Sequence, residues 1–258
     1  MNVLGWSKED HQMAIVRKFT IGVQPFAKMF RVYGKGGEVV DAVLRLRTKG
    51  LHDDFFSEVV VSNDRTAFRL SSEDQLNSLQ LTDENFTFTK DYYEANTSFD
   101  FKKVLDEFRL IWSAVNAVLN IQDVRRIGMV AEYRYSAETK SASGWLREKL
   151  TKLETQLLTE KFQLRFEERA PASDGLAPDP KKADFINYIY NFYDASMDAS
   201  HPSPGSIDVN LDVQRYFAPV INSSVPDEIL KLHKHFEKAE GHLDDKVKAF
   251  GAMSHGKK

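Results

Sequence analysis

The chain has 258 residues and a formal net charge of −3, with 42% hydrophobic, 12% aromatic and 28% charged residues. This composition is typical of folded proteins and excludes a disordered chain, and the balanced charge gives no overall attraction to nucleic acid or anionic membranes. The absence of cysteine excludes disulfides, thiolate metal sites and a cysteine nucleophile. No apolar run approaches the roughly 18–20 residues of a membrane span, and the first residues lack a signal-peptide core, so a cytoplasmic location is expected.

Residues 15 to about 91 are expected to form strands and tight turns. The segment 28–48 is interpreted as two extended pieces joined by a hairpin turn at the GKGG of residues 34–37. This motif lacks the GxxxxGK[ST] spacing of a phosphate-binding loop, and a strand is expected after it instead of a helix. Two more hairpins are predicted, with turns at Asn63-Asp64 and at residues 83–85.

The hydrophobic period then changes from two residues to between three and four. An amphipathic helix is predicted over residues 98–120, with Thr97 or Ser98 as its cap. A strand is expected at 124–136, and a second helix at 143–158. The apolar stripe of the first helix consists of Phe101, Val104, Leu105, Phe108, Ile111, Trp112, Val115, Val118 and Leu119.

The second half of the sequence shows the same succession of strands followed by a long helix. Strands are predicted at 161–169, at 184–196 and at 206–217, where the alternation is clearest. Aromatic residues are dense in 184–196, and its tyrosines would also suit a short helix. Residues 170–182 are interpreted as an exposed loop, because they are rich in Pro, Ala and Asp. A last helix is predicted over 225–250, followed by a frayed tail at 251–258.

These elements predict an α+β fold in which long amphipathic helices pack on a curved antiparallel sheet. Short turns between strands require antiparallel neighbours, since a parallel pair needs a long crossover. Two similar halves are expected: an N-terminal half at 1–140 and a C-terminal half at 141–258. No internal sequence repeat is detectable between them.

Three motifs resemble those of a family of uncharacterised prokaryotic proteins of similar length, sporadically distributed in bacteria and archaea. They are the Arg126-Ile127-Gly128 strand continuing to Tyr133–Tyr135, the paired-aspartate strand IDVNLDV at 207–213, and Leu232-His233 followed by Phe236. The likeness covers about residues 40–250. Here Met129, Val130, Ala131 and Glu132 intervene where the family strand usually continues Gly-Leu-Arg-Tyr. The resemblance implies an architecture and a mobile-element or phage-defence context, but no reaction.

The first candidate site is an anion pocket. Arg126, Glu132 and Arg134 fall on one face of the strand 124–136, and Arg165 lies on a similar polar row of a later strand. If those strands are neighbours, the three arginines converge on a phosphate or carboxylate, which guanidinium groups bind at two points. The alternative is a cross-strand ladder in which Glu132 and Glu167 neutralise the arginines, with about 0.2–1 kcal/mol per pair. The ladder is favoured.

Metal binding is not predicted. Asp208, Asn210 and Asp212 share a strand face, but side chains two residues apart stand about 6.5–7 Å from each other, which is too far for one ion. The histidines show no helical zinc spacing and no HExxH motif, and a nucleophile elbow GxSxG is absent. No catalytic constellation and no cofactor are therefore predicted.

The aromatic strand is the candidate interface. Tyr188, Tyr190 and Phe192 share one face of it and its other face is also largely apolar, as in a strand covered on both sides or at a dimer interface. The first functional hypothesis is therefore a non-catalytic binding or interaction protein that self-associates. A ligand sensor or enzyme using the arginine pocket is the alternative. RNA or DNA binding by the same arginines is a further alternative and is not favoured.

Overall fold

The computed structural model describes residues 15–51, 55–62, 67–93, 98–137, 141–153, 158–172, 185–221, 224–249 and 253–254. Its helices are α1 Arg31–Leu44, α2 Phe101–Leu119, α3 Ala142–Leu150 and α4 Val225–Ala249, with short 3-10 turns η1 Arg45–Lys49 and η2 Ala195–Met197. Its strands are β1 Val16–Pro25, β2 Glu58–Val61, β3 Ala67–Ser71, β4 Asn77–Thr82, β5 Phe86–Asp91, β6 Val124–Ser136, β7 Gln163–Pro171, β8 Phe185–Asp194, β9 Ser206–Ile221 and β10 Met253–Ser254.

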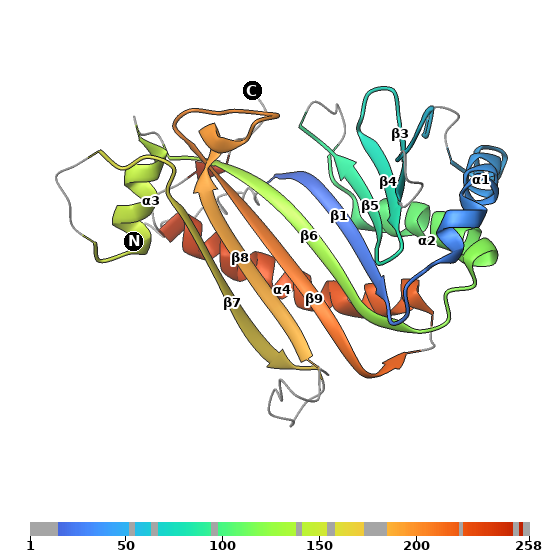
Figure 1. The fold of residues 1–258 in the computed structure, drawn as a ribbon. Coiled ribbons are helices and arrows are strands. Elements are labelled where there is room, and N and C mark those ends of the chain that lie inside the picture. Colours follow the sequence, from blue (N-terminus) through green and yellow to red (C-terminus); the bar gives the residue numbers. More distant parts are fainter. Residues whose placement is uncertain are drawn as a thin grey trace, which may run out of the picture.

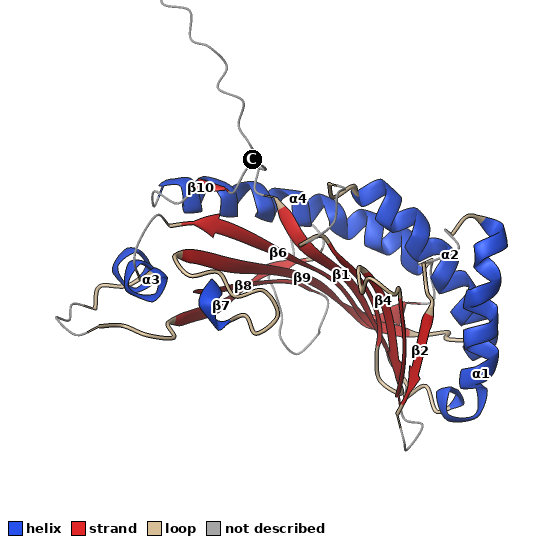
Figure 2. Cartoon of the chain, turned by 90° about the horizontal axis from the view of Figure 1, so that it is seen from above, coloured by secondary structure: helices blue, strands red, loops and turns tan. Residues whose placement is uncertain are grey.

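Antiparallel pairing joins these strands in one open sheet of order β2-β3-β4-β5-β1-β6-β9-β8-β7 (Figure 1). Strand β10 also pairs with β6. Helices α1, α2 and α4 lie along the outer side of its curve, as Figure 2 shows. The predicted fold class, an α+β fold with a curved antiparallel sheet, is confirmed. None of the described helices is long and apolar enough to cross a membrane.

The two halves of the chain share an order of elements. The first runs strand, helix, four-stranded meander, long helix, from β1 to α2; the second runs strand, helix, three-stranded meander, long helix, from β6 to α4. In each half the first strand pairs with the last strand of its own meander, and β1 and β6 pair antiparallel in the middle of the sheet. A local two-fold arrangement therefore relates the halves. This repeat divides the chain at about residues 120–123, before β6, whereas the sequence prediction placed the division at 140.

The central helix α2 confirms the element predicted over 98–120. Its N-cap is Asp100, not Thr97 or Ser98, and the Asp100 carboxylate accepts hydrogen bonds from the backbone N–H groups of Lys102 and Lys103 at 2.9 and 3.3 Å. Asn120 ends the helix in the left-handed conformation, with φ 52°. Seven residues of the predicted stripe are buried: Val104, Leu105, Phe108, Ile111, Trp112, Val115 and Leu119.

The hairpin predicted around the GKGG motif is wrong, because residues 31–44 form helix α1 with the glycines inside it. Val32, Val39 and Val43 recur at helical spacing and are all buried, and this buried stripe outweighs the cost of three glycines in a helix. A Cβ at Gly36 would lie 3.6 Å from the Phe68 ring of β3, an ordinary contact distance. The hydrophobic face of α1 therefore rests on the end of the sheet.

Two further elements differ from the sequence predictions. Helix α3 stops at Leu150 instead of continuing to 158, and Leu153 and Leu158 are 68% and 75% exposed. In the tail predicted to fray, Met253 and Ser254 pair with Ser136 and Tyr135 of β6. The predicted turn at Asn63-Asp64 and most of the predicted 170–182 loop lie outside the described residues.

Candidate functional site

The face of the sheet opposite the helices is polar along its central strands. On β6, Ile127, Met129, Ala131, Tyr133 and Tyr135 are buried on the helix side, so Arg126, Gly128, Val130, Glu132 and Arg134 point to the other face. The register places Tyr216, Gln214, Asp212, Asn210 and Asp208 of β9 opposite those five residues in turn. The predicted arginines of β6 and the predicted aspartate row of β9 therefore meet on this polar face.

Arg134 is neutralised there by carboxylates. Its Nε and Nη2 each donate a 2.7 Å hydrogen bond to Asp208, which is 0% exposed, and Nη2 also lies 3.4 Å from Asp198. Although burial alone would lower it, these contacts raise the pKa of Arg134 above its ordinary value, so the guanidinium stays charged. The aspartate strand is therefore salt-bridged at Asp208.

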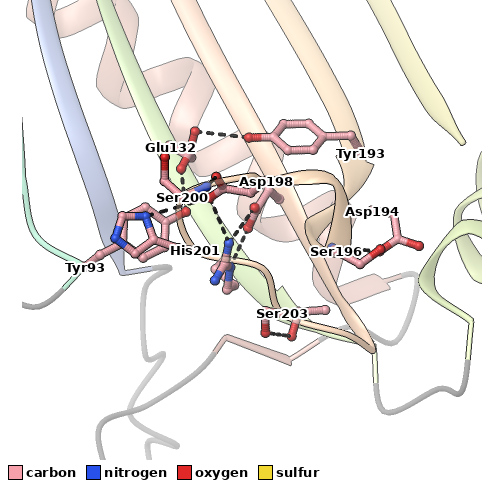
Figure 3. Close-up of polar contacts among 12 residues, drawn as sticks. Tyr93, Glu132, Tyr193, Asp194, Ser196, Asp198, Ser200, His201 and Ser203 are labelled. Carbon is pink, nitrogen blue, oxygen red and sulfur yellow. Dashed lines mark hydrogen bonds and ion pairs between the residues drawn. The ribbon is translucent and has the colours of Figure 1, made fainter. Parts of the chain in front are cut away.

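Glu132 is held by two tyrosines instead of an arginine. Tyr93 and Tyr193 donate their hydroxyl hydrogens to its two oxygens, the second at 3.1 Å (Figure 3). Burial and the neighbouring carboxylates raise the pKa of both hydroxyls, so neither is a ready nucleophile. His201 stacks on Tyr93 at 4.1 Å, and the guanidinium carbon of Arg134 lies 4.8 Å from the same ring. The network ties the β8–β9 connection to the sheet.

Carboxylate oxygens of Glu132, Asp198 and Asp208 all lie within 4.8 Å of one another, a spacing that a metal ion requires. In this cluster, however, Arg134 holds Asp208 and Asp198, and the tyrosines hold Glu132. A bound cation would have to displace a buried guanidinium that already supplies the compensating charge. The donor set therefore fits an internal salt-bridge network better than a metal centre.

Arg126 lies at the other end of β6 and has no carboxylate partner among the described residues. Its Nη1 donates to Gln214 at 3.3 Å and to the Tyr216 hydroxyl at 3.1 Å. It borders a hollow of about 230 Å³ in the polar face, which we call the glycine hollow. The hollow is lined by Thr20, Gly22, Val23, Gln24, Asn85, Phe86, Thr87, Arg126, Gly128, Val130, Asp212 and Gln214.

Arg165 lies on β7, and β7 is separated from β6 by β8 and β9. The three arginines were expected to converge only if their strands were neighbours. Strands β6 and β7 are not neighbours, so the arginines do not converge. Arg165 instead pairs with Glu167 at 2.7 Å, and its side chain is 55% exposed. Arg126 and Arg134 are eight residues apart along β6, or about 26 Å. The structure therefore brings Glu132 and Arg134 into one cluster and leaves Arg126 and Arg165 elsewhere.

The predicted interface residues lie on the helix side of β8. Phe192 is buried, and the Tyr188 hydroxyl lies 3.1 Å from His235 Nδ1. Tyr190 is half-buried and stacks on Phe166 of β7 with 5.0 Å between ring centroids. Phe166 is 40% exposed. The aromatic row thus continues to the edge strand and becomes accessible there.

Sequence reasoning missed Tyr93, Asp198 and His201, which come from connections and meet β6 only through the fold. It also missed the glycine pair, Gly22 and Gly128. The register places Gly22 of β1 directly opposite Gly128. In the sequence, the pair shows only as one glycine within each of two predicted strands. Those glycines do not indicate that the two strands are neighbours.

No protein-family model matches the chain, and no curated protein matches its sequence. Among solved structures, the chain is similar to the Methanococcus jannaschii TBP, with a TM-score of 0.32 and 6% sequence identity over 92% of this chain and 99% of that chain. A TM-score this low carries no argument about fold or function. The family resemblance described above stays a prediction.

Proposed function

We propose that the protein is a non-catalytic interaction protein that self-associates through the outer edge of β7. The observation that carries the proposal is the pattern of side chains on this edge strand, which is complementary to itself. Arg134 and Asp208 on the polar face engage each other, and Glu132 is held by Tyr93 and Tyr193, which supports a binding role over a catalytic one. A cytoplasmic location and a mobile-element or phage-defence context stay predictions.

Strand β7 ends the sheet, and five consecutive residues, Arg165–Arg169, are exposed. An unpaired strand edge offers a row of backbone donors and acceptors to another strand. Two copies of β7 related by a two-fold axis would pair antiparallel and extend the sheet from one molecule into the next. Nine residues are long enough for such a pairing.

One register satisfies the charges. With Phe166 on the two-fold axis, Phe166 faces Phe166 of the second copy, and each Arg165 faces a Glu167. Opposite charges directly across two strands contribute about 0.2–1 kcal/mol per pair, whereas like charges destabilise. Moving the axis by one residue puts Arg165 opposite Arg165, or Glu167 opposite Glu167. The strand therefore favours the pairing centred on Phe166 over the two pairings shifted by one residue.

The helix side of the same strand supplies apolar contact. Phe166 stacks on Tyr190 at 5.0 Å and lies 6.3 Å from Phe192. In the symmetric pairing, the two exposed Phe166 rings would cover each other and join the aromatic rows of both copies. Aromatic pairs of this kind stabilise by about 0.5–1.5 kcal/mol beyond the area that they bury. The predicted residues Tyr188, Tyr190 and Phe192 would then support the interface from behind.

The test is a charge exchange read by analytical ultracentrifugation over a range of protein concentrations. We expect the wild type to form a dimer, and Arg165→Glu or Glu167→Arg to shift it to the monomer because each places like charges opposite each other. The double variant R165E/E167R restores opposite charges and should dimerise again. Circular dichroism would confirm that all four proteins are folded.

Two further variants locate the apolar contact. Phe166→Asp should abolish the dimer, whereas Leu158→Asp, at a residue that is 75% exposed outside the strand, should leave it intact. A wild type that stays monomeric at every concentration would refute the proposal. A dimer that survives both single charge reversals would place the interface on another surface and would refute the β7 pairing.

A further inference from the structure

The glycine hollow lies where the first strands of the two halves pair. Gly22 of β1 and Gly128 of β6 face each other there, and both lie on the polar side of the sheet. Side chains on a sheet face stand roughly perpendicular to the sheet, and the two facing glycines contribute none of their own. A Cβ placed at Gly22 would meet nothing within 4 Å, so the space above the floor at Gly22 is open, whereas a Cβ at Gly128 would lie 3.3 Å from Gln214 Cγ and 3.7 Å from Asp212 Oδ1.

Polar groups surround this floor. Thr20 and Thr87 come from β1 and β5, and Arg126, Asp212 and Gln214 come from β6 and β9. The volume of about 230 Å³ corresponds to roughly seven or eight water molecules at about 30 Å³ each. It suits a ligand the size of one ring with a substituent, smaller than the usual drug-sized pocket.

The side chain of Gln214 fixes the charged wall. Its Oε1 accepts from Arg126 at 3.3 Å and from the Tyr216 hydroxyl at 3.0 Å, and its Nε2 donates to Asp212 Oδ2 at 2.5 Å. Arg126 uses only Nη1 for these contacts, which go to the Gln214 amide and the Tyr216 hydroxyl. It forms no ion pair with the described residues. An arginine held in this way is preorganised to bind an oxyanion at two points.

We propose that the glycine hollow binds a small planar carboxylate, whose ring lies on the backbone of Gly22 beside the Gln214 side chain and whose anionic group pairs with Arg126. The backbone at Gly22 accepts a planar group, since no atom lies within 4 Å of the position that its Cβ would take. The threonine hydroxyls of β1 and β5 can donate to or accept from polar ring substituents. This site is separate from the β7 edge and does not depend on self-association.

The test uses benzoate as the probe and two-dimensional amide NMR as the measurement. We expect saturable shifts at the amides of Gly22 and Gly128. Arg126→Gln should weaken benzoate binding at least about tenfold, because a charge-assisted contact is lost. Arg125→Gln is the matched control: Arg125 precedes Arg126 on the same strand, is exposed and lies over Phe26 on the other face, and its loss should change the affinity less than twofold.

A second pair of variants tests the floor. Gly22→Val fills the open space with a side chain that suits a strand, so binding should be lost while the protein stays folded. Gln80→Val puts the same side chain on the same face, two strands away, and should bind benzoate like the wild type. Absence of saturable shifts, or binding that persists in Arg126→Gln, would overturn the proposal.

The chemistry of the ligand is decided by two further probes. Benzamide has the same ring without the charge, so binding as tight as that of benzoate would overturn the role of Arg126. Inorganic phosphate has the charge without the ring. If phosphate binds as tightly as benzoate and Gly22→Val leaves its binding unchanged, the planar floor has no role and the proposal fails. Much weaker binding of both probes than of benzoate supports it.

Discussion

Arg134 and Asp208 form a two-point ion pair that joins the central strands β6 and β9, through two 2.7 Å hydrogen bonds to a fully buried carboxylate. The side chain of Arg134 is itself only 9% exposed. Each of these buried charges is compensated by the opposite charge of its partner. If one partner is removed, the other charge stays buried without compensation and destabilises the fold.

Removing one partner should therefore destabilise the fold more than removing both. We expect Arg134→Met and Asp208→Leu each to lower the free energy of unfolding by about 3 kcal/mol or more. The double variant should lose less than either single variant, and so much less than the sum of the two single losses. Urea denaturation of the four proteins gives this coupling energy, and additive losses would show that the two side chains act independently.

The exposed pair Arg165–Glu167 is the internal control for this experiment. Its atoms also lie 2.7 Å apart, but its side chains are 55% and 33% exposed. Surface ion pairs contribute about 0–1 kcal/mol. Alanine at either position, measured at a concentration where the protein is monomeric, should change the unfolding free energy by no more than about 1 kcal/mol.

The glycines of α1 give a prediction of the opposite sign. Gly34 and Gly37 are exposed, and a Cβ at either would meet nothing within 4 Å. Alanine at each should stabilise the protein by about 0.5–1 kcal/mol, because glycine loses more backbone entropy on entering a helix. Thermal unfolding of Gly34→Ala, Gly37→Ala and the double variant would measure this.

Gly50 is the matched control for that series. It follows η1 with φ 120°, a conformation that alanine rarely adopts, so Gly50→Ala should lower the melting temperature. If alanine at 34 or 37 were destabilising instead, the segment would not be an ordinary helix in solution.

These glycines also explain why α1 was not recognised in the sequence. Three glycines within four residues indicate a turn on local propensity, and the valines that decide the matter, Val32, Val39 and Val43, are separated by that motif. Alternation and helical spacing do identify β6, β9, α2 and α4, because each element buries one long uninterrupted face. At α1 the local preference of the glycines favours a turn, whereas the burial of the valines favours a helix. That burial depends on the packing of α1 against the sheet, which the sequence alone does not show.

The candidate sites were partly accessible from sequence. The polar face of β6 and the aspartate row of β9 follow from alternation alone, but their contact depends on β9 lying next to β6, 74 residues away at Arg134–Asp208. Arg165 was grouped with the other arginines by the same alternation. Arg165 is separated from them by two strands. The order of the strands is set by the meander and its closing helix, and the spacing of the arginines in the sequence does not indicate that order.

Asp212 gives the fold a pH dependence. Burial raises its pKa to about 6, and Gln214 and the positive charges of Arg126 and Arg165 only partly oppose this. A carboxyl group whose pKa is raised on folding stabilises the protein below its unfolded pKa near 3.8, and this stabilisation is lost as the pH rises through about 6. At pH 7 the ionised, buried group is therefore a net cost.

We expect Asp212→Asn to be more stable than the wild type at pH 7, by an amount on the order of 1–2 kcal/mol. The difference should shrink to near zero at pH 4, where the wild-type side chain is protonated. Urea denaturation of both proteins from pH 4 to pH 7 measures the difference directly, and carboxyl NMR gives the pKa itself. A difference that is independent of pH would mean that Asp212 has an ordinary pKa.

The same carboxyl group should regulate the glycine hollow. The groups that face it are Arg126 from β6 and Arg165 and Glu167 from β7, with Gln214 beside it on its own strand. When Asp212 is ionised, its charge opposes an anion held at Arg126; when it is protonated, that repulsion disappears.

Benzoate should therefore bind more tightly at pH 5 than at pH 7, by up to about tenfold, and Asp212→Asn should bind at pH 7 as tightly as the wild type does at pH 5. NMR titration of the Gly22 amide at both pH values measures the affinities. Equal pH dependence in both proteins would assign the effect to a group other than Asp212.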